Sequence, residues 1–227
     1  IDALLVGDSA GNTVLGYDST VYTKHEDIVR FTGAVARSCT RPLVLADLAF
    51  GTYQASVQDA VRHGVELMQA GAHAVKLEGG REILPQVEAL VNAGIPVCGH
   101  VGFTPQSVNQ LGGFKVQGRG EGADALLADA VALEEAGAFA VVLELVPAPL
   151  ATRVSETLEV PTIGIGAGAG CDGQVLVWQD MAGLSGFEPR FVKAFADLRS
   201  ELSRAAREYA DAVRAKSFPA PEHTFEQ

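Results

Sequence analysis

Acidic side chains recur in this sequence at the ends of short apolar runs. The runs cover residues 4–8, 43–47, 74–78 and 140–144, and they end in Asp8, Asp47, Glu78 and Glu144. Runs rich in Val, Ile and Leu are typical of strands buried in a parallel sheet, and α/β enzymes place their chemistry at the carboxyl ends of such strands. The repetition therefore predicts that four carboxylates gather at one edge of a sheet.

Three other side chains near these acids could bind an anionic substrate. Ser9 follows Asp8 directly, Lys76 precedes Glu78 by two residues and so points to the same side of the strand, and His100 ends a further apolar run. Each also has a structural alternative. The serine could cap a turn, the lysine could be a counter-ion for the acids, and the histidine could be a satisfied core residue.

The candidate ligands are hard oxygen atoms, which suit Mg²⁺ better than zinc. Cys39, Cys98 and Cys171 are scattered without CxxC spacing, so neither a zinc site nor a disulfide framework is indicated. Magnesium usually takes one or two carboxylates and keeps waters or substrate oxygens. We therefore expect two acids to bind the metal and the others to act through water or as a base. Alternatively, the acids cap helices or pair with surface Lys and Arg.

Predicted strands alternate with predicted helices along the whole chain. The strands cover residues 1–8, 43–47, 73–78, 95–100, 139–144, 161–165 and 174–178, and the helices cover 25–38, 55–70, 81–93, 123–136, 148–157 and 189–216. This alternation predicts an α/β fold with right-handed crossovers and a parallel sheet. Polar loops are expected at 9–24 and 103–122, and an irregular tail from about 217.

Seven strands in a chain that opens inside a strand indicate a (βα)₈ TIM barrel. We expect a single barrel domain over residues 1–227, with its first strand upstream of Ile1. An open doubly wound sheet is the alternative. No GxGxxG follows the first run, and acids on four separate strands suit a barrel mouth better than a switch-point crevice.

Composition narrows the class of protein further. The 227 residues are 48% hydrophobic and carry a net charge of −11, which argues against nucleic-acid or anionic-membrane partners. No apolar run of membrane-spanning length and no signal peptide is visible, so we expect a cytoplasmic protein.

The glycine-rich residues 164–170 could cradle a phosphate or allow close packing. Lys115 and Arg119 could meet an anion or be solvated.

Several runs of this sequence resemble the ketopantoate hydroxymethyltransferase family. They cover residues 6–9, 46–48, 75–80, 98–107, 112–120, 163–168 and 171–177, with 218–219 and 222–223 in the tail. The runs CGHVGFTPQS at 98–107 and GGFKVQGRG at 112–120 are long enough to be specific. The resemblance implies a barrel of the phosphoenolpyruvate/pyruvate type that uses Mg²⁺.

The resemblance also implies a reaction and an assembly. The family transfers a hydroxymethyl group from 5,10-methylenetetrahydrofolate to 3-methyl-2-oxobutanoate, giving 2-dehydropantoate in pantothenate biosynthesis, and it forms homo-oligomers, here expected to be a decamer. By family likeness, Asp8 and Asp47 ligate the metal and Glu78 lies beside it, through water. Ser9, Asp47, Lys76 and His100 bind the substrate, and Glu144 is the catalytic acid/base. The alternatives are a Mg²⁺-dependent carbon–carbon lyase and a catalytically inactive scaffold.

Overall fold

The first 175 residues carry a seven-stranded parallel sheet. The computed structural model describes residues 1–225 and divides into two compact units, Ile1–Val175 and Leu176–Gln227. Every strand pairs with the next one in the sequence, in the order β1 to β7. The strands are β1 (Ala3–Val6), β2 (Leu43–Asp47), β3 (Ala74–Lys76), β4 (Val97–Gly102), β5 (Ala140–Glu144), β6 (Thr162–Ile165) and β7 (Gly173–Gln174).

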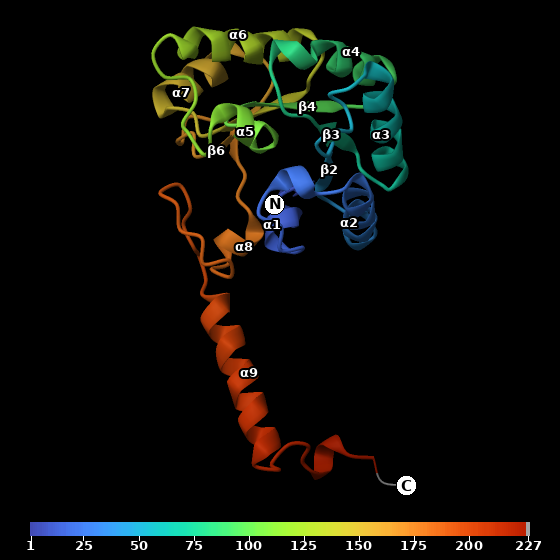
Figure 1. Cartoon of the computed structure of the whole chain (residues 1–227), viewed down its shortest axis with the longest axis vertical. Helices are drawn as coiled ribbons and strands as arrows, with labels where there is room; N and C mark the ends of the chain where they lie inside the picture. The colour runs from blue at the N-terminus through green and yellow to red at the C-terminus, as the bar shows by residue number, and fades with distance from the viewer. Residues whose placement is uncertain (226–227) are drawn as a thin grey trace. The chain divides into compact units, whose positions relative to one another are not determined.

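Helices in the crossovers pack on one face of this sheet, as Figure 1 shows for α3, α4 and α6. The α-helices of the first unit are α1 (Ala10–Thr13), α2 (His25–Ser38), α3 (Val57–Gln69), α4 (Leu84–Asn92), α5 (Val108–Leu111), α6 (Gly122–Glu135) and α7 (Ala148–Thr157). Short 3₁₀ helices are η1 (Thr20–Tyr22), η2 (Arg81–Ile83) and η3 (Pro105–Ser107). Among the described residues, no helix combines the length and the apolar character needed to cross a membrane.

The expected α/β barrel-type fold is confirmed. All six strand pairings are parallel and sequential, which is the winding of a TIM barrel. Within residues 1–225, β1 pairs with β2 and β7 pairs with β6, and no pairing joins β1 to β7. The sheet is therefore a curled half-barrel of seven strands.

The strand expected at 174–178 is wrong beyond its first residue. β7 is Gly173–Gln174, which pairs with Ile163 and Gly164 of β6. β6 ends at Ile165, where Gly166 turns the chain with a φ of +64°, so no strand edge remains for residues 176–178. A short helix, α8 (Trp178–Met181), begins there instead.

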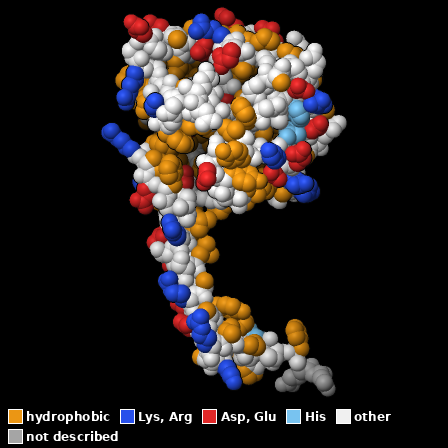
Figure 2. All heavy atoms as spheres, viewed as in Figure 1, with side chains coloured by type: hydrophobic (Ala, Val, Ile, Leu, Met, Phe, Trp, Pro, Cys, Tyr) orange, Lys and Arg blue, Asp and Glu red, His pale blue; other side chains and the backbone are white. Residues whose placement is uncertain are grey.

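The helix expected at 189–216 begins later than the sequence indicated. It is α9 (Leu198–Arg214), and the Asp197 side chain caps it by accepting a hydrogen bond from the Ser200 N–H at 3.2 Å. Residues 189–197 are irregular, because the helix begins only after the capping residue Asp197. Charged side chains and exposed apolar ones such as Leu202 and Tyr209 both lie along α9 (Figure 2). A 3₁₀ turn, η4 (Pro221–His223), lies in the expected tail, and the predicted tail residues 226–227 lie outside the described residues.

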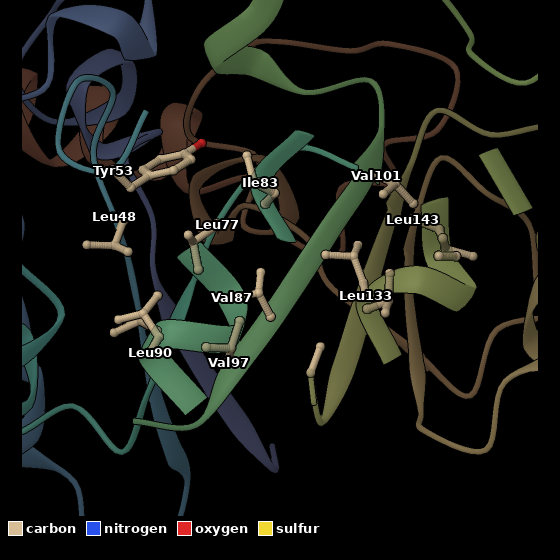
Figure 3. Close-up of a cluster of buried hydrophobic side chains, with 14 of the residues drawn as sticks. Leu48, Tyr53, Leu77, Ile83, Val87, Leu90, Val97, Val101, Leu133 and Leu143 are labelled. Atoms are coloured by element: carbon tan, nitrogen blue, oxygen red, sulfur yellow. The ribbon is translucent and has the colours of Figure 1, made fainter. Parts of the chain in front are cut away.

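Alternation along the strands separates two apolar clusters. The larger cluster lies between the sheet and the helices. Figure 3 shows Leu77, just after β3, and Val97 and Leu143, from β4 and β5, in one cluster with Leu90 of α4 and Leu133 of α6. The smaller cluster lies on the other, inner face of the sheet. It consists of Leu45, Ala74, Cys98, Ala140 and Val142.

Candidate active site

The inner face of the sheet changes from apolar to charged toward the carboxyl ends of the strands. Successive side chains of a strand point to opposite faces, so the residue two positions after an inner one is also inner. The inner pairs are Leu45 and Asp47, Ala74 and Lys76, Cys98 and His100, and Val142 and Glu144. This register places four of the candidate site residues on one buried face.

Lys76 is the centre of the charged layer. Its Nζ lies 3.0 Å from Asp47 Oδ1, 3.7 Å from Glu78 Oε1 and 3.2 Å from His100 Nδ1, and all these side chains are buried. Burial by itself would lower the Lys76 pKa, but the charges of Asp47, Glu78 and Asp8 outweigh it and raise the pKa. The lysine therefore stays cationic and is the counter-ion of the acids.

Asp8 reaches the same site by a turn rather than by strand register. β1 ends at Val6, and the Asp8 N–H then donates to Asp47 Oδ2 at 3.0 Å while Thr23 Oγ1 donates to the Asp8 carbonyl at 2.7 Å. Burial, together with the neighbouring Asp47, raises the pKa of Asp8 to about 7. The chain thus brings a second carboxylate beside Asp47.

His100 and Glu144 face each other beside Lys76. Burial and the Lys76 charge lower the His100 pKa well below its usual value, so the imidazole is neutral. Lys76 donates to Nδ1, which puts the remaining proton on Nε2, 3.3 Å from Glu144 Oε2. Burial raises the pKa of Glu144 to about 7. A carboxyl with this pKa can exchange protons near neutrality.

Ser9 is half-buried at the start of α1. Its side chain makes no helix-capping hydrogen bond, and its hydroxyl has no hydrogen-bond partner within residues 1–225. A Cβ on the adjacent Gly7 would lie 3.0 Å from Ser9 Oγ and 3.5 Å from Asp47 Oδ2, so the glycine allows this close approach. The Ser9 hydroxyl and Asp47 Oδ2 therefore both border the space at Gly7, and the hydroxyl is available to a ligand.

Gln106 is a buried site residue that the sequence pattern did not single out. Its backbone N–H donates to Glu78 Oε2 at 2.9 Å, and its Nε2 donates to Asp8 Oδ2 at 2.9 Å. Burial raises the pKa of Glu78 well above its usual value. The only signal for Gln106 was its place in the specific run 98–107, where the pattern Thr-Pro-Gln-Ser indicates a helix start.

The charge of this cluster fits a divalent cation. Three carboxyl groups, from Asp8, Asp47 and Glu78, lie around one cationic lysine, and a divalent cation bound there would favour their ionised forms. Asp47 Oδ1 is buried without an aligned hydrogen-bond donor. The described residues contain no ready-made cluster of three His, Cys, Asp or Glu ligands. Two carboxylates completed by water or substrate oxygens are the ligand set that Mg²⁺ accepts.

Two other sequence candidates have structural explanations. A Cβ on Gly168 would lie 2.6 Å from Ala148 Cβ, and one on Gly170 would overlap Thr152, so the glycine-rich loop packs closely on α7. Lys115 and Arg119 are exposed. Close packing and solvation account for these features without an anion.

A cavity of about 350 Å³ adjoins the charged layer at Glu78 and Gln106. Phe50 and Tyr53 supply aromatic walls, and amide side chains from the loops after β2 and β4 supply polar ones. Loops that follow strands line this space, as at the mouth of a barrel. A flat ligand with polar edges could therefore lie next to the acids.

A sequentially wound parallel sheet with charged side chains at its carboxyl ends defines an enzyme of the TIM-barrel type. Solved structures agree on the fold. Phosphonopyruvate hydrolase complexed with oxalate and Mg²⁺ gives a TM-score of 0.58 at 16% identity, covering 98% of this chain and 81% of that one. Phosphoenolpyruvate phosphomutase from Streptomyces platensis subsp. rosaceus gives 0.60 at 15%, covering 97% and 80%.

The sequence is much more similar to one family of transferases. The ketopantoate hydroxymethyltransferase family matches residues 1–221. A 3-methyl-2-oxobutanoate hydroxymethyltransferase of Saccharopolyspora erythraea is 59% identical over 228 residues, covering all of this chain and 78% of the relative. One of Mycolicibacterium paratuberculosis is 56% identical, covering 99% and 80%. The chain belongs to the ketopantoate hydroxymethyltransferase family, and the expected resemblance is confirmed.

Proposed function

We propose that this protein transfers a hydroxymethyl group from 5,10-methylenetetrahydrofolate to 3-methyl-2-oxobutanoate, giving 2-dehydropantoate for pantothenate biosynthesis. The observation that carries the proposal is the buried cluster in which Lys76, Asp47 and Glu144 share one face. It combines a cation for a substrate carboxylate, acids for a metal, and a base with a pKa near 7. Family membership supports the reaction, and the relatives' names supply the acceptor.

In this proposal Asp8 and Asp47 hold Mg²⁺ directly and Glu78 holds it through water. When bound, Mg²⁺ supplies Lewis-acid stabilisation for the negative charge that develops on the keto oxygen. Asp47 therefore lies next to both the metal and the substrate. The gathering of three carboxyl groups around Lys76 supports this assignment.

The chain's own groups bind the keto acid and move its proton. Lys76 Nζ and Ser9 Oγ bind the substrate carboxylate, and His100 packs beside it. Glu144 takes the C3 proton, which leaves a carbon nucleophile that attacks the methylene carried by the folate. The attack breaks one of the two C–N bonds of the methylene carbon, and water replaces the second folate nitrogen. The hydroxyl of the water stays on the carbon, and its other proton and the proton taken by Glu144 go to the two nitrogens, which releases the product and tetrahydrofolate. The raised pKa of Glu144 supports its assignment as the base.

We assign the folate donor to the cavity beside Glu78 and Gln106. Phe50, which is 46% exposed, offers a flat apolar surface there. Phe50→Ala is expected to raise KM for the donor several-fold without changing KM for the keto acid, because stacking is worth about 0.5–1.5 kcal/mol. Equal effects on both KM values in steady-state kinetics would contradict this assignment.

We also propose that the protein forms a homo-oligomer, which sedimentation would test.

Hydrogen exchange at C3 of 3-methyl-2-oxobutanoate tests the proposal. In D₂O with Mg²⁺ and no folate, the C3 proton signal is expected to disappear in NMR spectra, and complete turnover is expected only after the folate donor is added. A carbon–carbon lyase would turn over without folate. A protein that neither exchanged the proton nor bound Mg²⁺ in calorimetry would be an inactive scaffold. Asp47→Ala exchanging at the wild-type rate would contradict the metal assignment.

A further inference from the structure

Gln106 uses every hydrogen-bonding group of its side chain inside the site. Its Nε2 donates to Asp8 Oδ2 and to the Leu48 carbonyl, both at 2.9 Å. Its Oε1 lies 2.8 Å from the Tyr53 hydroxyl and 3.1 Å from Gln54 Nε2, both of which are donors. The two acceptors on one side and the two donors on the other determine the orientation of the amide.

The same residue also reaches a second acid through its backbone. The Gln106 N–H donates to Glu78 Oε2 at 2.9 Å, so this one residue hydrogen-bonds two of the three carboxylates assigned to the metal. Gln106 is 5% exposed and comes from η3, whereas Asp8 follows β1, 98 positions earlier. The contact therefore ties the two sides of the site together.

Tyr53 holds the amide from behind. Its ring is 1% exposed, and Figure 3 shows it at the edge of the apolar cluster near Leu48, with the hydroxyl oxygen pointing away from that leucine. The Glu78 N–H donates to this hydroxyl at 3.2 Å, and the hydroxyl also lies 2.9 Å from the Glu78 carbonyl oxygen. Tyr53 thus couples the Gln106 amide to the backbone of Glu78, just beyond the end of β3.

We propose that Gln106 is a positioning residue that orients the Asp8 and Glu78 carboxylates for metal binding. The inference rests on the proposed function, because it takes those carboxylates as the metal site. By occupying Asp8 Oδ2, the amide leaves Oδ1 for a cation, and by occupying Glu78 Oε2 it leaves Oε1 facing Lys76. A neutral amide donor can do this without changing the charge of the cluster.

Isothermal calorimetry of Mg²⁺ binding to Gln106→Met tests the assignment. Methionine keeps the length and burial of the side chain but cannot donate to Asp8, while the backbone bond to Glu78 stays. We expect Mg²⁺ affinity to fall about 10- to 100-fold, the usual effect of removing a hydrogen-bond partner of a metal ligand. Tyr53→Phe, which removes one partner of the amide, is expected to weaken binding in the same direction by a smaller factor.

Gln86→Met is the matched control. Gln86 is also buried, at 9% exposed, and its Nε2 donates to the Tyr53 carbonyl at 3.2 Å, but within residues 1–225 its side chain makes no hydrogen bond to an acid of the site. We expect this variant to bind Mg²⁺ as the wild type does, even if its thermal midpoint drops as much as that of Gln106→Met. A general loss of packing would weaken Mg²⁺ binding in both variants and would overturn the proposal.

The outcomes separate this inference from the proposed function. A folded Gln106→Met variant with wild-type Mg²⁺ affinity would overturn the positioning role while leaving the reaction intact. Wild-type protein that binds Mg²⁺ but shows no folate-dependent turnover would overturn the reaction while leaving the positioning role measurable. Wild-type protein that binds no Mg²⁺ would overturn both. In kinetics, Gln106→Met is expected to raise the Mg²⁺ concentration needed for half-maximal rate more than it lowers kcat.

Discussion

The inner face of the sheet has two layers of side chains, which come from the same strands but differ in how burial affects their stability. The lower layer contains small and medium apolar side chains such as Leu45, Cys98 and Val142. The upper layer, two residues further along each strand, contains Asp47, His100 and Glu144. Both layers are largely buried, so the difference lies in chemistry and not in solvent access.

Burial stabilises the lower layer and opposes the upper one. Removing apolar surface from water contributes roughly 25 cal/mol per Å², whereas a buried ionised group loses its hydration unless it is paired. This loss of hydration is the main reason why the pKa values of Asp8 and Glu144 are raised to about 7. We therefore expect substitutions in the upper layer to change activity first and those in the lower layer to change stability first.

Replacing Glu144 with Gln has the largest expected effect. The amide keeps the shape of the side chain but cannot accept a proton, so kcat is expected to fall roughly 10²- to 10⁴-fold. Mg²⁺ affinity measured by calorimetry is expected to stay near the wild-type value. If Mg²⁺ affinity collapsed instead, Glu144 would be a metal ligand and its role as the base would be wrong.

Lys76→Met is the expected exception, because this substitution in the charged layer should lower the stability of the fold. Methionine leaves Asp47 and Glu78 without their buried counter-ion, and breaking a buried pair typically costs about 3–5 kcal/mol of unfolding free energy. Urea denaturation of the metal-free protein checks this. Lys115→Met, at an exposed position, is the control and is expected to change little. Unchanged stability in Lys76→Met would mean that the neighbouring acids are protonated when the lysine is absent.

Leu45→Ala tests whether a substitution in the apolar layer lowers stability without lowering kcat. The substitution leaves a cavity below Asp47 and is expected to lower the unfolding free energy by about 2–5 kcal/mol. Its kcat, measured well below the new thermal midpoint, is expected to stay within about a factor of 3 of the wild type, because the charged layer keeps its hydrogen bonds. A loss of kcat as large as that of Glu144→Gln would show that the two layers are not separable.

The pH profile gives the smallest effect, about tenfold per pH unit. A base works in its ionised form, so kcat is expected to fall as the pH drops below the Glu144 pKa of about 7. Lys76 stays charged and His100 stays neutral in this range, because the first has a raised pKa and the second a lowered one. The pKa values of Asp8 and Glu78 are also raised, so the profile is measured at saturating Mg²⁺, which keeps both acids ionised. Under these conditions the residual activity of Glu144→Gln is expected to lose this dependence. A profile unchanged in that variant would assign the titration to another group.

Much of this structure follows from local sequence. The predicted helices at 25–38 and 148–157 match α2 and α7 to the residue, because their apolar spacing and end signals are strong. Period-two alternation predicts that Glu78, two residues beyond the end of β3, shares a face with Lys76. The chain stays paired with β4 there, because the Leu77 and Gly79 N–H groups donate to the Cys98 and His100 carbonyls, and the two side chains lie 3.7 Å apart. The family-specific runs identify the family before any contact is known.

Only the tertiary structure decided how Asp8 and Gln106 enter the site. Asp8 lies beyond the end of β1, so strand alternation does not determine its direction, and a turn held by Asp47 and Thr23 brings it inward. Gln106 meets Asp8 across 98 positions of sequence. Local sequence determines periodic faces and helix ends because these depend on near neighbours. Contacts between distant turns depend on how the whole sheet curls, which no short stretch of sequence contains.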